Sequence, residues 1–161
     1  GLILDNRLYR GSAYAAGEIG HMPINEAGPS CNCGGIACLE SYIGNRRIIA
    51  LARSAFEKDI TLEDLSAMAH RGNKKAIAVW DSVGEHLGIA LVAVVNLLNP
   101  DCIVIGGGVA NAGDVLFNKV RETILMRAML VQARSARVVK AKLGSDAGMI
   151  GAGLLVKESI S

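Results

Sequence analysis

Residues 17–40 read Gly-Glu-Ile-Gly-His-Met-Pro-Ile-Asn-Glu-Ala-Gly-Pro-Ser-Cys-Asn-Cys-Gly-Gly-Ile-Ala-Cys-Leu-Glu. This stretch, the cysteine loop, is rich in Gly and Pro as far as Gly35 and has no helical period there, so burial alone would not order it. It holds one imidazole, His21, and three thiols, Cys31, Cys33 and Cys38. Together these four side chains are a complete ligand set for tetrahedral zinc. A bound ion would supply the order that burial does not.

Four protein ligands leave no coordination position for water, so the zinc predicted here is structural rather than catalytic. A disulfide between Cys31 and Cys33 would close a very small, strained ring. The alternative is three unrelated small apolar cysteines beside a solvated histidine. The density of ligands among glycines favours zinc. The fourth cysteine, Cys102, lies in an apolar run and is expected to be a buried apolar residue.

Carboxylates flank the predicted ligands. Glu18 lies three residues before His21, Glu40 lies two residues after Cys38, and Glu26 lies between them. Carboxylates held in place by a metal suit a polyhydroxylated ligand, because each accepts hydrogen bonds from hydroxyl groups. They could equally be surface carboxylates beside a zinc knuckle. The spacing alone leaves both interpretations open.

The composition argues against nucleic-acid binding. The 161 residues suffice for one buried core, and 51% are apolar while 20% are charged, as in an ordinary soluble domain. The net charge is only +2, basic residues cluster at most in pairs, and 4% of the residues are aromatic. Such a chain has neither a basic footprint nor stacking platforms, so we expect no nucleic acid to bind to it.

We expect a cytoplasmic protein without a membrane span. The most apolar run, residues 88–98, is too short to cross a bilayer and contains Asn96. Thiols clustered beside a histidine, with no signal peptide, favour a reducing compartment. The chain begins at Gly1 inside an apolar run without an initiating Met, which leaves room for a leader or a whole domain upstream.

Local patterns predict an α/β fold. Asp5-Asn6 is the turn of a hairpin over residues 1–11, and Thr61 opens a helix with a capping box. The second half of the predicted helix 74–98 is apolar almost all round, which predicts burial at the domain centre. The other helices are predicted over 39–56, 61–72, 114–131 and after Asp146, and strands over 101–105 and 137–143. Helices interleaved with strands are typical of α/β folds.

Gly106, Gly107 and Gly108 follow the first of these strands and precede a helix. Glycine there lets a ligand approach the backbone closely, at the end of a sheet where ligands bind. The run is neither a Walker A loop nor a Gly-x-Gly-x-x-Gly fingerprint, and a tight turn explains it equally well. The small residues of the last helix predict close helix packing, and His70 and His86 are expected to be exposed or locally bonded.

Three segments together resemble the signature of the ROK family: Ala16-Gly17-Glu18-Ile19-Gly20-His21, Cys31-Asn32-Cys33-Gly34-Gly35 and Cys38-Leu39-Glu40. The resemblance continues through residues 99–101, 103–109 and 146–152, and so covers nearly the whole chain. This family comprises bacterial sugar kinases, among them glucokinases, fructokinases and N-acetylmannosamine kinases, and related sugar-responsive repressors.

The resemblance implies an actin-like, ribonuclease-H-like ATPase fold of two lobes with sugar and ATP in the cleft between them. Residues 1–161 would form a single C-terminal lobe, with residues 17–40 as its zinc- and sugar-binding loop. Glu18, His21 and Glu40 would bind hydroxyls of a hexose or N-acetylhexosamine. One nitrogen of His21 would bind the sugar, and the other would ligate zinc. Gly106, Gly107 and Gly108 would line the nucleotide pocket, and the protein would form a homodimer.

The sequence departs from the family pattern in one large respect. Members carry an Asp-x-Gly-Gly-Thr phosphate loop near their N-terminus and, later, an Asn-x-Asp whose Asp is the general base, and neither motif occurs ahead of the cysteine loop here. We therefore expect the N-terminal lobe to be absent and this chain alone to be inactive, although the full-length parent would be a glucokinase-like enzyme using ATP and Mg²⁺.

Two other interpretations remain open. The chain could be the effector-binding lobe of a sugar-responsive repressor, whose helix-turn-helix would lie upstream. The intact glycine run favours the kinase, because a repressor has less need to hold ATP. A zinc-knuckle interaction module would leave the rest of the resemblance unexplained.

Overall fold

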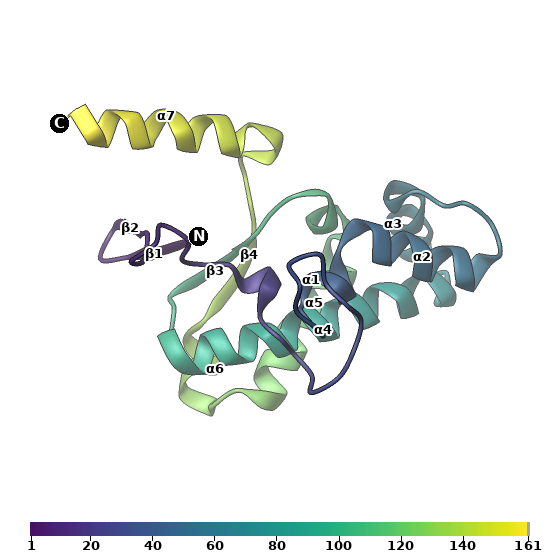
Figure 1. Ribbon diagram of the computed structural model, residues 1–161. Coiled ribbons are helices and arrows are strands. Elements are labelled where there is room, and N and C mark those ends of the chain that lie inside the picture. The colour runs from purple at the N-terminus through teal and green to yellow at the C-terminus, as the bar shows by residue number, and fades with distance from the viewer. Residues whose placement is uncertain (161) are drawn as a thin grey trace.

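The computed structural model describes residues 1–160, without the side chains of residues 145 and 158–160. The strands are β1 (Leu2–Leu4), β2 (Arg7–Tyr9), β3 (Cys102–Ile105) and β4 (Arg137–Lys140). The α-helices are α1 (Glu40–Ile43), α2 (Asn45–Phe56), α3 (Leu62–His70), α4 (Lys74–Leu98), α5 (Asp114–Arg127), α6 (Leu130–Ser135) and α7 (Ala147–Ile160). Short 3₁₀ helices are η1 (Ile19–His21), η2 (Gly108–Ala112) and η3 (Gly144–Asp146). Strands are interleaved with helices along the chain, as the sequence predicts (Figure 1).

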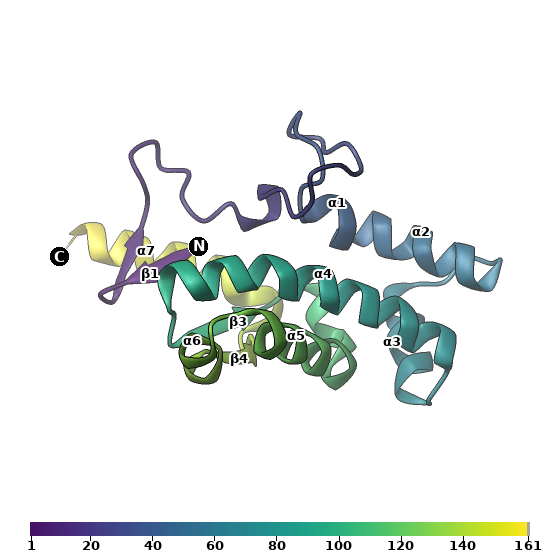
Figure 2. The same cartoon turned by 90° about the horizontal axis from the view of Figure 1, so that it is seen from below.

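Helix α4 is the centre of the fold. In Figure 2 the cysteine loop, α1 and α2 lie on one side of it, and α5 with β3 and β4 lies on the other. Asn73 caps its N-terminus by accepting a hydrogen bond from the Ala76 amide at 3.1 Å. Its length and composition would suffice for a membrane span, but 44% of its apolar window is buried inside the protein. We therefore assign α4 as the core helix of the domain.

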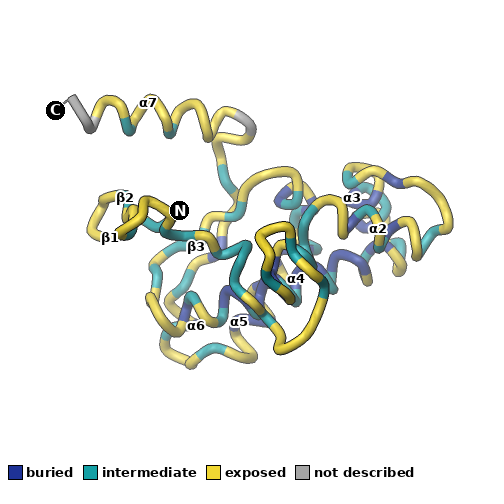
Figure 3. Tube along the Cα trace, in the orientation of Figure 1, coloured by how far each residue is buried: buried dark blue, intermediate teal, exposed yellow. Residues whose placement is uncertain are grey.

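Burial along α4 differs from the sequence prediction. Buried residues run from Ala76 to Val95, so the polar first half contributes as much to the core as the apolar second half. Trp80 is fully buried, whereas Leu97 is 83% exposed in the last turn. The reason is that α2 and α3 pack against α4 beside its first half, while its last turn extends past these neighbours (Figure 2). Figure 3 shows the buried residues gathered on α3, α4 and α5.

Two glycines bring α4 and α5 close together. A Cβ on Gly84 would lie 2.8 Å from the Lys119 Cβ, and a Cβ on Gly88 would lie 2.5 Å from the Thr123 Cβ. Both pairs are spaced by one helical turn, so the backbone of α4 faces side chains of α5 along two successive turns. Thr123 directs its hydroxyl to the Lys119 carbonyl oxygen at 2.8 Å, which leaves its methyl group for this contact.

The described strands form two separate two-stranded sheets. β1 and β2 pair antiparallel around Asp5 and Asn6, whose φ angles of 51° and 59° confirm the predicted tight turn. β3 and β4 pair parallel, in the register Cys102 with Arg137 to Ile105 with Lys140. Val138 of β4 is buried in the core that contains α5.

Three predicted boundaries are wrong. The predicted helix 39–56 breaks at Gly44, whose extended backbone (ψ 147°) separates α1 from α2. The predicted helix 114–131 ends at Arg127, because the Met129 amide donates instead to Asn96 Oδ1 at 2.9 Å. The predicted strand 137–143 ends at Lys140, opposite the end of β3.

Helix α7 does not show the close packing that its small residues predict. It extends away from the helices around α4 (Figure 1), and most of it is exposed (Figure 3). Within the described part of the chain, no atom outside α7 and the chain neighbours lies within 4 Å of a Cβ built on Gly148, Gly151 or Gly153.

Candidate functional site

A tight backbone turn presents the thiols of Cys31 and Cys33. The Cys31 amide donates to the Gly35 carbonyl at 2.8 Å, and the Gly34 amide donates back to the Cys31 carbonyl at 3.0 Å. Gly34 has a φ of +90°, a conformation that glycine adopts readily and other residues rarely do. A second constraint is the antiparallel β-bridge between the backbones of Pro23 and Cys38, which pairs the segment after His21 with the segment before α1.

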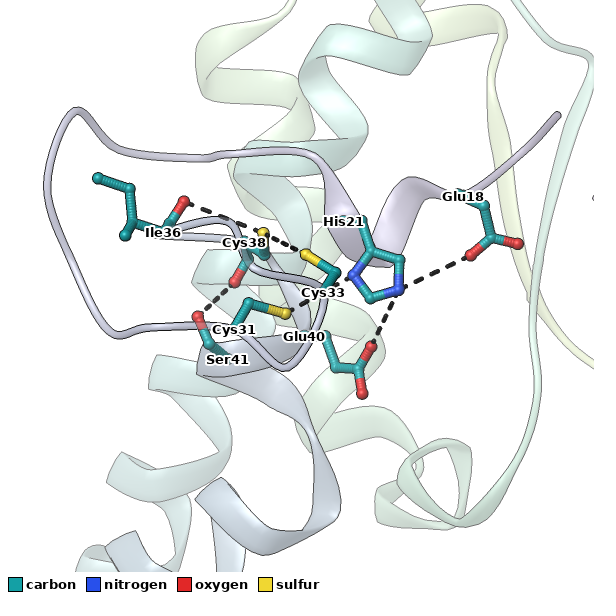
Figure 4. A network of polar contacts seen from close by, with 8 residues as sticks. All are labelled: Glu18, His21, Cys31, Cys33, Ile36, Cys38, Glu40 and Ser41. Atoms are coloured by element: carbon teal, nitrogen blue, oxygen red, sulfur yellow. Dashed lines mark hydrogen bonds and ion pairs between the residues drawn. The ribbon is translucent and has the colours of Figure 1, made fainter. Parts of the chain in front are cut away.

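This folding brings together all four predicted zinc ligands, His21, Cys31, Cys33 and Cys38 (Figure 4). Their ligand atoms all lie within 4.8 Å of one another. The Cys31 Sγ lies 3.6 Å from His21 Nδ1, and the Cys33 Sγ lies 3.7 Å from the Cys38 Sγ. Two sulfur ligands of a tetrahedral zinc are about 3.8 Å apart, given a Zn–S bond of ~2.3 Å. The donor set and its spacing fit a structural zinc ion.

The thiols of Cys33 and Cys38 differ in their environment. A backbone hydrogen bond from Gly35, with further hydrogen bonds from neighbouring thiols, lowers the pKa of Cys33 to about 7. Burial raises the pKa of Cys38 to about 11, because the loop and the start of α1 shield it from water. Cys33 is exposed at the surface and Cys38 is 2% exposed.

The second ring nitrogen of His21 faces carboxylates. Its Nε2 lies 3.9 Å from Glu18 Oε2 and 3.7 Å from Glu40 Oε2 (Figure 4). The His21 side chain is 36% exposed, and the side chains of Glu18 and Glu40 are 68% and 56% exposed. Three polar groups thus converge on the solvent side of the thiol cluster. Such a group can accept and donate several hydrogen bonds to one polyhydroxylated ligand.

The end of the cysteine loop enters the core through α1. Leu39 is 1% exposed, and the Ser41 hydroxyl donates to the Cys38 carbonyl at 2.7 Å. Glu40 therefore projects from a helical turn whose neighbouring residues are fixed. A Cβ on Gly44 would lie 2.8 Å from the Glu40 carbonyl oxygen, so the close approach that ends α1 depends on this glycine.

The glycine run lies at a different place, after β3. Gly107 has a φ of +74° and ψ of −174°, a conformation essentially restricted to glycine. Gly108 lines a cleft of about 270 Å³ between α3 and η2; the other lining residues are Leu62, Glu63, Ser66, Ala67, His70 and Asn111. Gly106 and Gly107 directly precede Gly108 in the sequence, but they do not line this cleft. Cys102 on β3 is partly exposed rather than fully buried.

Sequence reasoning missed two groups of residues near these sites. Tyr42 and His86 stack their rings 4.6 Å apart beside the cysteine loop, and Asn25 contacts the Tyr42 hydroxyl. The single sequence signal for this contact is the position of Tyr42, an aromatic residue four places after Cys38. His70 and Asn111 line the cleft, but they are distant in sequence and nothing in their local pattern links them.

Comparisons with known proteins agree on one family. The model of the ROK family matches residues 1–159. A glucokinase of Halalkalibacterium halodurans is 35% identical over 98% of this chain, and a xylose repressor of Caldicellulosiruptor bescii is 29% identical over 94% of it.

Solved structures share the fold. The ROK family glucokinase of Streptomyces griseus, determined in complex with glucose and AMPPNP, has a TM-score of 0.83 and 25% identity over 93% of this chain. The α/β fold is thus that of the family's sugar kinases. This chain corresponds to 52% of the first glucokinase, 41% of the repressor and 54% of the Streptomyces enzyme. It therefore spans about half the length of these relatives, and it belongs to the ROK family.

Proposed function

We propose that this chain is the sugar-binding, zinc-containing C-terminal lobe, residues 1–161, of an ATP-dependent hexose kinase of the glucokinase type. One observation carries the proposal: His21 directs Nδ1 at the thiols and Nε2 at Glu18 and Glu40. An imidazole so placed links a structural site to an exposed polar face. Glu18, His21 and Glu40 bind the hydroxyls of a hexose or N-acetylhexosamine on that face.

Zinc would be held by Nδ1 of His21 and the thiolates of Cys31, Cys33 and Cys38, and its contribution is structural. With all four positions filled by protein atoms, the site leaves none for substrate. Its effect is to fix the imidazole orientation and the spacing between Glu18 and Glu40. Glu18 and Glu40 are mostly exposed. Without the metal they would have to lose conformational freedom when the sugar binds, and this entropy cost would weaken the affinity for the sugar.

The cleft lined by Gly108 is the proposed nucleotide site. The wall of this cleft carries no side chain at Gly108, where a Cβ would meet no atom within 4 Å, and such an open backbone suits a planar base or a phosphate. The Streptomyces enzyme, of similar fold, was solved with both glucose and AMPPNP, and this supports a site for each in the family. Groups that position the phosphates, bind Mg²⁺ and deprotonate the sugar hydroxyl would come from the other half of the parent protein.

An effector-binding lobe of a sugar-responsive repressor is the second candidate. The similarity to a xylose repressor, over 94% of this chain, favours it. The two candidates differ in the nucleotide. A kinase lobe should bind an ATP analogue in the Gly108 cleft, whereas a repressor lobe needs only the sugar. In either case we place the parent in the cytoplasm, as a homodimer whose C-terminal lobe contacts no nucleic acid.

Calorimetric titration with glucose tests the sugar site. Glu18→Gln removes a charge and keeps the shape of the side chain, so it should weaken glucose binding by roughly tenfold, the loss of a charge-assisted hydrogen bond. Glu26→Gln makes the same change at an exposed position of the same loop and should bind like the wild type. Equal affinity for glucose in all three proteins would place the sugar elsewhere. Failure of the wild type to bind glucose, N-acetylmannosamine or fructose would overturn the proposal.

A further inference from the structure

An aromatic pair joins the cysteine loop region to the core helix. The ring of Tyr42, on α1, stacks on the ring of His86, on α4, with centroids 4.6 Å apart and an interplanar angle of 20°. His86 Nδ1 lies 2.7 Å from the Ser82 carbonyl oxygen, which can only accept, so Nδ1 donates and the ring is held in place. Tyr42 therefore rests on a support that is itself anchored to α4.

The hydroxyl end of Tyr42 lies against the cysteine loop. It accepts a hydrogen bond from Asn25 Nδ2 at 3.2 Å. A Cβ on Gly28 would lie 2.0 Å from the same hydroxyl oxygen and 3.0 Å from the Ala37 Cβ. Only glycine allows the chain to pass this close to the tyrosine. The contacts of Asn25, Gly28 and Tyr42 involve none of the four predicted zinc ligands.

Tyr42 also fixes the rotation of the short helix that carries Glu40. Leu39 and Tyr42 are three residues apart and so share one face of this turn. Leu39 is buried in the core, and Tyr42 packs on α4 through His86. Glu40 lies on another face, with its Oε2 3.7 Å from His21 Nε2. A rotation of this turn would move the carboxylate away from the imidazole.

We infer that Tyr42 is a positioning residue: it is a second clamp on the cysteine loop, independent of the thiols, that holds the loop against α4 and orients Glu40. The part concerning ligand binding rests on the sugar site proposed above. The part concerning the loop does not, since it follows from the contacts of Tyr42 with Asn25, Gly28 and His86.

Hydrogen exchange in the zinc-loaded full chain tests the clamp without sugar. The reporters are the amides of Ile24 and Ala37, which donate to the carbonyls of Ala37 and Pro29 at 2.9 Å each. Tyr42→Leu removes the ring and the hydroxyl. It should speed exchange at both amides by roughly tenfold, which corresponds to the free energy lost with the aromatic pair and its hydrogen bond. Tyr42→Phe keeps the stacked ring and should speed it by less than about threefold.

Tyr14→Leu is the matched control, since Tyr14 is 79% exposed and outside the loop. It should leave exchange at the loop amides unchanged. Exchange at core amides, such as that of Val83 on α4, should be the same in all variants. Unchanged loop exchange in Tyr42→Leu overturns the inference. Equal acceleration in loop and core also overturns it, because Tyr42 would then only contribute to global stability.

The ligand arm uses calorimetry with glucose on the zinc-loaded chain. Tyr42→Leu should weaken glucose binding by about fivefold or more through misplacement of Glu40, while Tyr42→Phe should bind nearly as the wild type does. Equal affinity in Tyr42→Leu and the wild type overturns the positioning role. If the wild type itself binds no glucose, the proposed function fails, and the exchange experiment still decides whether Tyr42 clamps the loop.

Discussion

His21 presents its two ring nitrogens to two different sets of side chains. Nδ1 lies 3.6 Å from the Cys31 sulfur, and Nε2 lies within 4 Å of Glu18 and Glu40. The ring can serve both sets only in one orientation, and the thiol side is the more enclosed of the two. How well the exposed carboxylates are held in position therefore depends on how well the thiols hold the His21 ring.

Replacement of Cys31 by Ser should abolish zinc binding and destabilise the protein. Serine keeps the size of the side chain but is a poor zinc ligand, and the loop has few apolar contacts to replace the metal. We expect a decrease in Tm of roughly 4–16 °C, the effect of about 2–4 kcal/mol in a chain of this size. Cys102→Ser, on β3, is the control and should retain one zinc per chain. Full thermal stability of Cys31→Ser would show that no metal organises the loop.

The thiols of the metal-free protein should differ in reactivity with pH. The pKa of Cys33 is lowered to about 7, so its thiolate fraction rises as the pH passes from 6 to 8. The pKa of Cys38 is raised to about 11, so this buried thiol stays protonated over the same range. Iodoacetamide should therefore alkylate Cys33 first, with a midpoint near pH 7, as read by mass spectrometry of peptides. Faster alkylation of Cys38 than of Cys33 at pH 7 would contradict this.

The sequence was sufficient to choose the four candidate zinc ligands, because their chemistry and local density point to one ion. It could not reveal the Tyr42–His86 stack, whose members lie 44 residues apart on α1 and α4. Contacts of this kind depend on how helices pack, and a single tyrosine or histidine carries no pattern. The cleft lined by His70, Gly108 and Asn111 was out of reach for the same reason.

At the scale of the elements, the α4–α5 contact depends on glycine at two successive turns. In Gly88→Ala the new methyl group would lie 2.5 Å from the Thr123 Cβ, so the helices must separate. Strain of about 1–3 kcal/mol is offset in part by the gain of ~1 kcal/mol in helix propensity, and we expect a net loss of up to about 2 kcal/mol in the free energy of unfolding. Urea unfolding followed by the fluorescence of Trp80, the single tryptophan, measures it.

Gly153→Ala is the matched control for that variant. In α7 the new methyl group would have no atom within 4 Å among the described residues beyond its own helix and chain neighbours. It should therefore leave stability unchanged or raise it by up to about 1 kcal/mol through helix propensity. A Gly88→Ala variant as stable as Gly153→Ala would mean that α4 and α5 do not pack as closely as the structure indicates.

Element types could be predicted from the sequence more fully than element ends. Thr61 and Asn73 side chains accept from the amides of Asp64 and Ala76, so the helix starts follow local chemistry. The end of α5 depends instead on Asn96, whose Oδ1 accepts a hydrogen bond from the Met129 amide 33 residues further along the chain. Tertiary contacts of this kind override the local pattern.

At the scale of the whole molecule, the chain spans about half the length of its relatives. The proposed sugar face and the Gly108 cleft lie on this half, whereas neither an Asp-x-Gly-Gly-Thr nor an Asn-x-Asp motif precedes the cysteine loop. We therefore expect the chain to bind glucose but to transfer no phosphoryl group from ATP to it. A coupled assay for ADP, with an intact glucokinase as the positive control, measures this. Substantial turnover by the chain alone would contradict the assignment of catalysis to the other half.

The central claim is that a zinc ion held by His21 and three thiols shapes a sugar-binding face. The most direct test is a calorimetric titration with glucose of the zinc-loaded chain and of the same chain stripped by a chelator, with zinc content measured in both. We predict about one zinc per chain in the loaded protein and a loss of glucose affinity of roughly tenfold or more on stripping, while circular dichroism shows the helices retained. Equal glucose affinity with and without zinc, or a purified protein that binds no zinc, would contradict the account.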